Sequence, residues 1–452
     1  MPRRQKLKKS YLSPFQLLVI FYFLVITVSA LFLNLPFAHK PGVDFSLMDG
    51  IFTAVSAVSV TGLTVVSIAN TFSVAGTFIL LIVIQIGGIG IMTISTFLWL
   101  IFGKKIGLKE RQLIMADHNQ LALAGLVDLM KQIFLLMLVI EFVGFLILGT
   151  YYLMYFPTAK EAYYQALFAT ISATTNSGFD ITGQSLLPFQ HDYFVQIVHM
   201  ILMVLGAIGF PVLIEVKRFF QHKRNNAIPY RFSLFTKLTT TTYFGLAVVG
   251  FLLIFFLETN HAFANKTWDD RVFTSLFQSI TTRSSGFSTI DMNEFSLATQ
   301  LVLIALMFIG ASPNSVGGGI RTTTFAILLL GIYFFAKGRR SIKIFRREVH
   351  EEDIMKAFVV GTVAILLFAS AVIFLAVTEP FSLTEIMFEV ASAFGTCGLS
   401  LGITPYLSTS GKVVIMLLMF IGRIGLVTLL FLLREKAIKE HYHYPKERVV
   451  IG

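Results

Sequence analysis

The chain has 452 residues, of which 55% are hydrophobic and 13% are charged. A soluble domain could not bury that much apolar surface, so the composition excludes a soluble globular protein and indicates a membrane protein. The single cysteine, Cys397, excludes an intramolecular disulfide and a cysteine cluster for zinc or iron–sulfur. A net charge of +11 would suggest nucleic acid as the partner of a soluble protein, but in a membrane protein its distribution decides its meaning.

Eight apolar runs are long enough to cross about 30 Å of hydrocarbon. They lie near residues 14–35, 75–102, 126–156, 194–216, 234–257, 299–335, 357–378 and 413–433. The first run contains Val28-Ser29-Ala30, which also fits a signal-peptide cleavage site, but it continues to Leu35 and so favours an uncleaved helix. The sequence therefore predicts an all-α polytopic membrane protein with eight transmembrane helices.

The basic residues indicate the orientation. With eight spans, both termini lie on one side of the membrane, and the segments on that side hold 28 of the 36 Lys and Arg residues. Positive charge accumulates on the cytoplasmic side, so we expect a multi-pass membrane protein with both termini in the cytoplasm. Anionic lipid is then the expected partner of the basic segments, and nucleic acid is not.

A segment too short to cross the bilayer lies between the two spans of each successive pair, and each segment ends in a glycine. These glycines, Gly62, Gly178, Gly286 and Gly398, are 116, 108 and 112 residues apart, close to a quarter of the chain. We expect four pseudo-symmetric repeats, each a helix, a short re-entrant pore helix, an extended strand and a second helix. Non-helical backbone at membrane depth must be buried or line a cavity, so four such strands predict a central ion pore.

The expected boundaries follow from this pattern. They are a cytoplasmic N-terminal segment 1–13, repeat 1 at 14–102, repeat 2 with its preceding cytoplasmic loop at 103–220, repeat 3 at 221–337, repeat 4 at 338–434 and a cytoplasmic C-terminal tail at 435–452.

The glycine-containing strands are the predicted selectivity filter. If they meet on one axis, their carbonyl groups form rings of four oxygens that replace the water around an ion, and glycine permits the positive φ that this requires. The pore helices point their C-terminal ends toward the centre, which favours a cation. The predicted filter residues are uncharged, which favours potassium over calcium: Val60, Thr61, Gly62, Asn176, Ser177, Gly178, Ser284, Ser285, Gly286, Thr396, Cys397 and Gly398. We expect Arg283, just before the third strand, to point behind the filter and hold the strand.

The sixth span is interrupted by a string that cannot propagate a helix because it contains Pro313 and four glycines. We expect this gate loop, residues 310–319, to face the cavity below the filter and block ions; a passive kink is the alternative. Arg423 lies in the last apolar run, where an arginine indicates a functional role near the pore, unless it forms an ion pair with Glu141. The predicted gate residues are Gly310, Ala311, Ser312, Pro313, Asn314, Ser315, Val316, Gly317, Gly318, Gly319 and Arg423.

Several strings resemble the superfamily of Trk, Ktr and plant HKT potassium transporters, and most closely the Ktr-type membrane subunit. The resemblance covers nearly the whole chain. The strings are Ser59-Val-Thr-Gly62-Leu, Gln85-Ile-Gly-Gly-Ile-Gly90, Gly103-Lys-Lys-Ile-Gly-Leu-Lys-Glu-Arg111, Met307-Phe-Ile-Gly310-Ala-Ser-Pro-Asn-Ser315-Val-Gly-Gly-Gly319-Ile and Met419-Phe-Ile-Gly-Arg423-Ile-Gly425.

The resemblance implies a location in the bacterial plasma membrane. It also implies a homodimer in which each protomer carries its own pore, docked on a cytosolic ring of nucleotide-binding regulatory subunits of the RCK type. It also implies potassium selectivity, because members with glycine in all four filters are selective, whereas some relatives with serine in the first pass sodium. The chain departs from the common pattern at Ser177, Arg321 and Cys397.

The function predicted from the sequence is the potassium-translocating membrane subunit of a Ktr-type uptake system. Potassium is its substrate, and sodium is a coupling or activating ion at most. The chain has no nucleotide-binding motif and no catalytic constellation, so we expect no cofactor in the chain and no enzymatic activity. The alternative is a secondary transporter with sodium-coupled cation symport and no channel-like pore.

Overall fold

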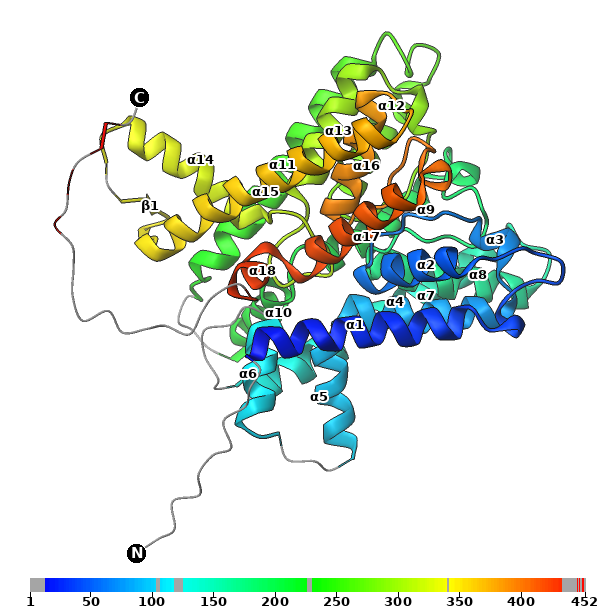
Figure 1. Ribbon diagram of the computed structural model, residues 1–452, viewed down its shortest axis with the longest axis horizontal. Helices are drawn as coiled ribbons and strands as arrows, with labels where there is room; N and C mark the ends of the chain where they lie inside the picture. Colours follow the sequence, from blue (N-terminus) through cyan, green and yellow to red (C-terminus); the bar gives the residue numbers. More distant parts are fainter. Residues whose placement is uncertain are drawn as a thin grey trace, which may run out of the picture.

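The computed structural model describes residues 13–102, 106–117, 125–225, 230–339 and 341–432, together with Pro445, Glu447, Val449 and Val450. The expected N-terminal segment (except Ser13) and nearly all of the expected C-terminal tail lie outside these residues. The described chain is helical apart from a short antiparallel hairpin, in which β1 (Lys343–Ile344) pairs with β2 (Arg347–Glu348). The prediction of an all-α polytopic fold is confirmed (Figure 1).

The helices fall into four successive groups with the same order. The first group is α1 (Pro14–Leu33), η1 (Pro36–Ala38), α2 (Leu47–Ser59), α3 (Ile68–Thr71), α4 (Val74–Ile89) and α5 (Ile91–Ile101), followed by α6 (Leu108–Asp117). The second is α7 (Leu126–Tyr152), α8 (Ala159–Thr174), η2 (Leu187–Phe189), α9 (Tyr193–Ala207) and α10 (Phe210–Asn225). The third is α11 (Leu234–Glu258), α12 (Trp268–Thr281), η3 (Met292–Glu294), α13 (Leu297–Ile309) and α14 (Thr322–Ala336). The fourth is α15 (Glu351–Thr378), α16 (Leu383–Gly395), η4 (Thr404–Tyr406), α17 (Thr409–Ile424) and α18 (Leu426–Leu432).

Each repeat begins with an uninterrupted apolar helix of 20 to 28 residues, long enough to span the bilayer: α1, α7, α11 or α15. A short pore helix follows, and the sequence marks its start with a hydroxyl side chain. In each case this side chain accepts the backbone N–H of the third helical residue, an N-cap that holds the first turn. The caps are Ser46, Thr158, Thr267 and Ser382.

The second helix of each repeat is broken, which corrects the prediction of continuous spans at 75–102, 194–216 and 413–433. The pairs α4/α5, α9/α10 and α17/α18 bend by 99°, 101° and 96°. In the third repeat α13 and α14 are separated by the gate loop instead. Every break falls at an Ile-Gly pair whose glycine has positive φ, a conformation that ends a helix: Gly90, Gly209, Gly310 and Gly425.

The four repeats close into a ring. The pore helix α8 packs on α4 of the preceding repeat, α12 packs on α9, and α16 packs on α13. The pore helix α2 of the first repeat packs on α17 of the last, which completes the circle. The pore helices therefore surround one centre, whereas α5 and α6 project to one side of the molecule (Figure 1).

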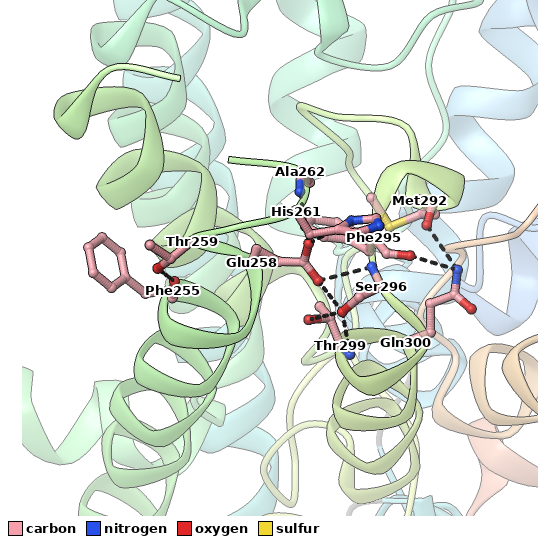
Figure 2. A network of polar contacts seen from close by, with 10 residues as sticks. All are labelled: Phe255, Glu258, Thr259, His261, Ala262, Met292, Phe295, Ser296, Thr299 and Gln300. Carbon is pink, nitrogen blue, oxygen red and sulfur yellow. Dashed lines mark hydrogen bonds and ion pairs between the residues drawn. The ribbon is translucent and has the colours of Figure 1, made fainter. Parts of the chain in front are cut away.

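A buried carboxylate at the end of α11 ties the first and second helices of repeat 3 together, a contact that was not predicted. Glu258 is fully buried and accepts the backbone N–H of Ser296 at 3.0 Å and its hydroxyl at 2.6 Å. Figure 2 shows Glu258 pointing from α11 toward the start of α13, where Ser296 also caps the helix by accepting the N–H of Thr299. Repeat 4 has the same arrangement, with Glu379 accepting the N–H and the hydroxyl of Ser408.

Candidate functional site

The four predicted filter segments share an unusual backbone. In each segment the glycine has positive φ, between 67° and 99°, and so does the non-glycine residue two positions earlier. The φ of this earlier residue is 119° in the segment of repeat 3, at Ser284. In the other three segments it lies between 48° and 57°, at Val60, Asn176 and Thr396. Left-handed conformations cost a non-glycine residue about 1–2 kcal/mol and persist only where the surrounding structure imposes them.

Hydrogen bonds to the pore helices hold this backbone. The residue just before each glycine donates its N–H to a carbonyl four or five residues earlier, at 2.8 or 2.9 Å. The donors are Thr61, Ser177, Ser285 and Cys397, and the acceptors are Ser56, Ser172, Thr281 and Ser392. The amide groups thus point back into the protein. Among the twelve predicted filter residues, the four glycines are partly exposed and the other eight are buried.

The glycines bring the four segments to one centre. A β-carbon on Gly62 would lie 2.1 Å from the carbonyl oxygen of Ser177, and one on Gly178 would lie 2.5 Å from that of Ser285. A β-carbon on Gly286 would lie 2.3 Å from the carbonyl oxygen of Cys397, and one on Gly398 would lie 2.3 Å from that of Thr61. Each repeat therefore contacts the next, and the fourth contacts the first. No side chain fits at these four positions without displacing backbone.

Two of the side chains before the glycines, Cys397 and Ser177, contact the pore helices. The Cys397 Sγ lies 3.5 Å from the carbonyl oxygen of Thr281 in α12. The Ser177 hydroxyl lies 2.9 Å from the hydroxyl of Ser172 in α8. Ser177 and Cys397, two of the residues that depart from the expected pattern, thus each contact a pore helix. In the described residues no group of three or more His, Cys, Asp or Glu side chains could hold a metal ion.

The gate loop lies against the first residue of each of two filter segments, Ser284 and Thr396. A β-carbon on Gly317 would lie 2.0 Å from the Ser284 hydroxyl, and one on Gly318 would lie 2.6 Å from the Thr396 hydroxyl. These contacts leave no room for a side chain between loop and filter. The loop also bonds to the break between α9 and α10. Its Ser312 and Val316 N–H groups donate to the carbonyls of Ala207 and Gly206, and its Asn314 carbonyl accepts the N–H of Phe210.

Two arginine side chains donate hydrogen bonds to carbonyl groups of the gate loop. Arg423 lies at the end of α17, 8% exposed, and donates to the carbonyl of Val316 in the loop and to those of Gly87 and Gly88 at the end of α4. Arg321, which follows the loop, donates to the carbonyls of Gly317 and Ser312.

The ion pair between Arg423 and Glu141, left open by the sequence, does not form. Glu141 instead accepts a hydrogen bond from Gln85 at 2.7 Å.

A cavity of about 780 Å³ lies on the side of the loop away from the filter. Its lining includes Pro313, Asn314 and Ser315 of the loop, and also Arg321 and Arg423. Gly317 and Gly318 face the filter and these loop residues face the cavity, so the loop stands between the two. The sequence predicted the loop and Arg423 but missed Arg321 as a second residue that holds the loop, because its place after three glycines carried no signal of burial.

The comparisons with known proteins decide the family. The family model described as TrkH, cation transport protein, matches residues 4–441. The chain belongs to the TrkH family of cation transport proteins. It is 59% identical over 441 residues to the Ktr system potassium uptake protein D of Bacillus subtilis, with 98% of each chain covered. It is 36% identical over 443 residues to the Ktr system potassium uptake protein B of the same organism, with 97% of each covered.

The TrkH fold is confirmed by a solved relative. The crystal structure of the potassium transporter TrkH from Vibrio parahaemolyticus matches with a TM-score of 0.74 at 19% identity, covering 96% of this chain and 87% of that chain. The predicted resemblance to the Ktr-type membrane subunit is thus confirmed, and so is a multi-pass membrane protein of a transporter family.

Proposed function

We propose that this chain is the potassium-translocating subunit of a Ktr-type uptake system and that its four filter segments form one potassium-selective pore. The observation that carries the proposal is the closed ring in which each filter glycine abuts the carbonyl group before the next glycine. Because the amides bond backward and the glycines are partly exposed, the carbonyl groups are the polar groups left to face an ion. Rings of neutral carbonyl oxygens suit a weakly hydrated monovalent cation.

The second part of the proposal concerns gating. The gate loop occupies the space between the filter and the cavity of about 780 Å³, and Arg423 places a positive charge beside it. A cation leaving the filter would have to displace this loop. The loop is therefore the gate, in its closed position. With both termini in the cytoplasm, as the basic segments favour, the cavity opens toward the cytoplasm.

The partners belong to the proposal as well. We infer a homodimer with one pore per protomer, docked on a cytosolic RCK-type ring that binds the regulatory nucleotide. The high identity to Ktr system proteins over nearly the full chain supports a shared system. The chain acts as a transporter and not as an enzyme, with potassium as its substrate.

Growth tests the function directly. Expressed together with a Ktr-type regulatory subunit in a bacterial strain that lacks its own potassium uptake, the chain should restore growth at low potassium. Failure of well-expressed wild-type protein to restore growth or potassium uptake would contradict the proposed function.

A further inference from the structure

Repeat 3 departs from fourfold symmetry in two ways. The residue three positions before the filter glycine is small or neutral in three repeats and is arginine in the third: Ser59, Thr175, Gly395 and Arg283. The second helix continues directly after its Ile-Gly break in three repeats, whereas in repeat 3 the gate loop follows Gly310. The one charged residue in this set and the one inserted loop thus belong to the same repeat.

The structure joins these two departures. Arg283 is fully buried, and its Nε donates to the carbonyl oxygen of Gly310, the first residue of the gate loop, at 3.2 Å. Its Nη1 donates to the carbonyl oxygen of Tyr243 in α11 at 3.1 Å, and the guanidinium carbon lies 4.5 Å from the centre of the Tyr243 ring. One side chain therefore connects the filter strand, the first long helix of the repeat and the base of the loop.

The buried charge of Arg283 is balanced without a carboxylate. In the described part of the chain it forms no ion pair. It follows the C-terminal end of α12 and donates to the carbonyl just past the C-terminal end of α13. Helix C-termini carry partial negative charge, and an aromatic face attracts a cation, so both features stabilise the guanidinium at this place. Moving Gly310 away would remove one of these partners and leave a buried donor unpaired, which costs about 1–3 kcal/mol.

The next residue, Ser284, adds a second contact between filter and loop. Its φ of 119° differs from the 48° to 57° of its counterparts, and its hydroxyl donates to the carbonyl of Thr396 at 3.2 Å. The same hydroxyl lies against Gly317 near the end of the loop. The loop thus meets the third filter strand at its base through Arg283 and near its end through Ser284.

We infer that Arg283 is a positioning residue that couples the gate loop to the third filter strand, so that the closed loop and the filter conformation stabilise each other. This inference rests on the proposed gating function and adds the side chain through which the gate and the filter communicate. A purely structural arginine would stabilise the fold in the same way whether or not the loop is present. A coupling arginine acts on ion flux only while the loop is there to be held.

The experiment is a double-mutant cycle on potassium efflux from liposomes that contain the purified full-length protein. Arg283→Lys keeps the charge but cannot bond two carbonyls with one planar group. It should raise efflux at least threefold in the intact chain. In the chain lacking Ser312–Val316, the same substitution should change efflux less than 1.5-fold. Tyr243→Leu, which removes the ring beneath the guanidinium, should show the same dependence on the loop.

Two matched variants serve as controls. Tyr243→Phe removes a buried hydroxyl that has no hydrogen-bond partner among the described residues and keeps the ring, so efflux should stay at the wild-type level. Thr175→Val alters the position that corresponds to Arg283 in repeat 2, and its effect should not depend on the loop.

Equal effects of Arg283→Lys in the intact and deleted chains, or no effect in folded intact protein, would overturn the coupling. If the loop deletion alone fails to raise efflux, the proposed gate itself is wrong.

Discussion

At the predicted filter glycines, both the backbone conformation and the neighbouring carbonyl group determine whether a side chain can fit. At Gly62 the φ of 90° and the nearby Ser177 carbonyl both exclude a side chain, whereas at Gly402 the φ of 92° is the same but the space around it is open. The two positions therefore separate backbone strain from obstruction of the carbonyl ring.

We predict that Gly62→Ser lowers the potassium-to-sodium permeability ratio about tenfold, equivalent to about 1.4 kcal/mol, because the new side chain displaces a ring carbonyl and weakens the fit to potassium. Radiotracer or fluorescence flux in liposomes measures the ratio. Gly402→Ser should leave the ratio unchanged, since it adds similar strain without a clash. An unchanged ratio in Gly62→Ser would show that this ring does not select the ion.

At the residue scale, the sequence singled out the four glycine segments that the structure brings to one centre, but not how their backbone is held. Four glycines at matching phase revealed the segments, because only glycine accepts positive φ freely. The positive φ of Val60, Ser284 and Thr396 could not be predicted, since nothing in their side chains favours it; of the four, only Asn176 has a side chain that tolerates it. It arises from the hydrogen bonds to the pore helices, which are tertiary contacts.

At the scale of elements, the bends in the second helices were missed for a physical reason. Hydropathy shows whether a segment is apolar but not whether it bends. Because α4 and α5 are both apolar, the 99° bend between them leaves no mark in the hydropathy. The Ile-Gly pairs at the four breaks were the available signal, visible only once the repeats are aligned on their filter glycines. The gate loop was predicted because its proline and glycines exclude any helix.

We predict that deleting Ser312–Val316 raises cation flux through the isolated subunit several-fold and leaves the potassium-to-sodium ratio unchanged. The deletion removes the segment between filter and cavity while the filter keeps its bonds to the pore helices. Arg423→Ala should raise flux by a smaller factor than the deletion does, because it removes hydrogen bonds worth about 0.5–1.5 kcal/mol each but leaves the loop in place. Loss of flux in folded deleted protein, or a changed ratio without faster flux, would assign the loop to the binding site.

We predict that Ser296→Ala lowers the free energy of unfolding of the purified protein by about 2–4 kcal/mol. Ion selectivity should not change. The substitution removes the cap of α13 and also the hydroxyl that donates to the buried Glu258, whereas the backbone N–H of residue 296 still donates to it. Ser73→Ala is the matched control, because Ser73 caps α4 with no carboxylate as partner. Thermal unfolding in detergent measures both, and equal losses would show that the carboxylate contributes nothing beyond the cap.

At the scale of the whole molecule, the fourfold repetition of helices and the meeting of the four glycine segments could be predicted, but the contacts that couple the repeats could not. The spacing of the glycines implies four units, and the packing of α2 on α17 completes the ring. Arg283 was expected to hold its own strand, whereas it also reaches the gate loop 27 residues later. Such contacts depend on the relative placement of elements, which hydropathy and local propensity do not encode.

We predict that removing residues 442–452 weakens the proposed homodimer. This tail mixes aromatic, proline and aliphatic residues, which is unusually apolar for a free cytoplasmic end, although nearly all of it lies outside the described residues. Chemical cross-linking and light scattering in detergent should detect dimers of the full chain and more monomer after truncation. A truncated protein that remains fully dimeric and transports normally would exclude a role for the tail at the subunit contact.

The most direct test of the central claim, one potassium-selective pore built by four segments of one chain, is the reversal potential of the Ser312–Val316 deletion variant in planar bilayers under opposing potassium and sodium gradients. The account predicts a reversal potential near the potassium equilibrium value, with current that persists when sodium is replaced by an impermeant cation. A reversal potential near zero, or a current that requires sodium, would contradict it and favour sodium-coupled symport.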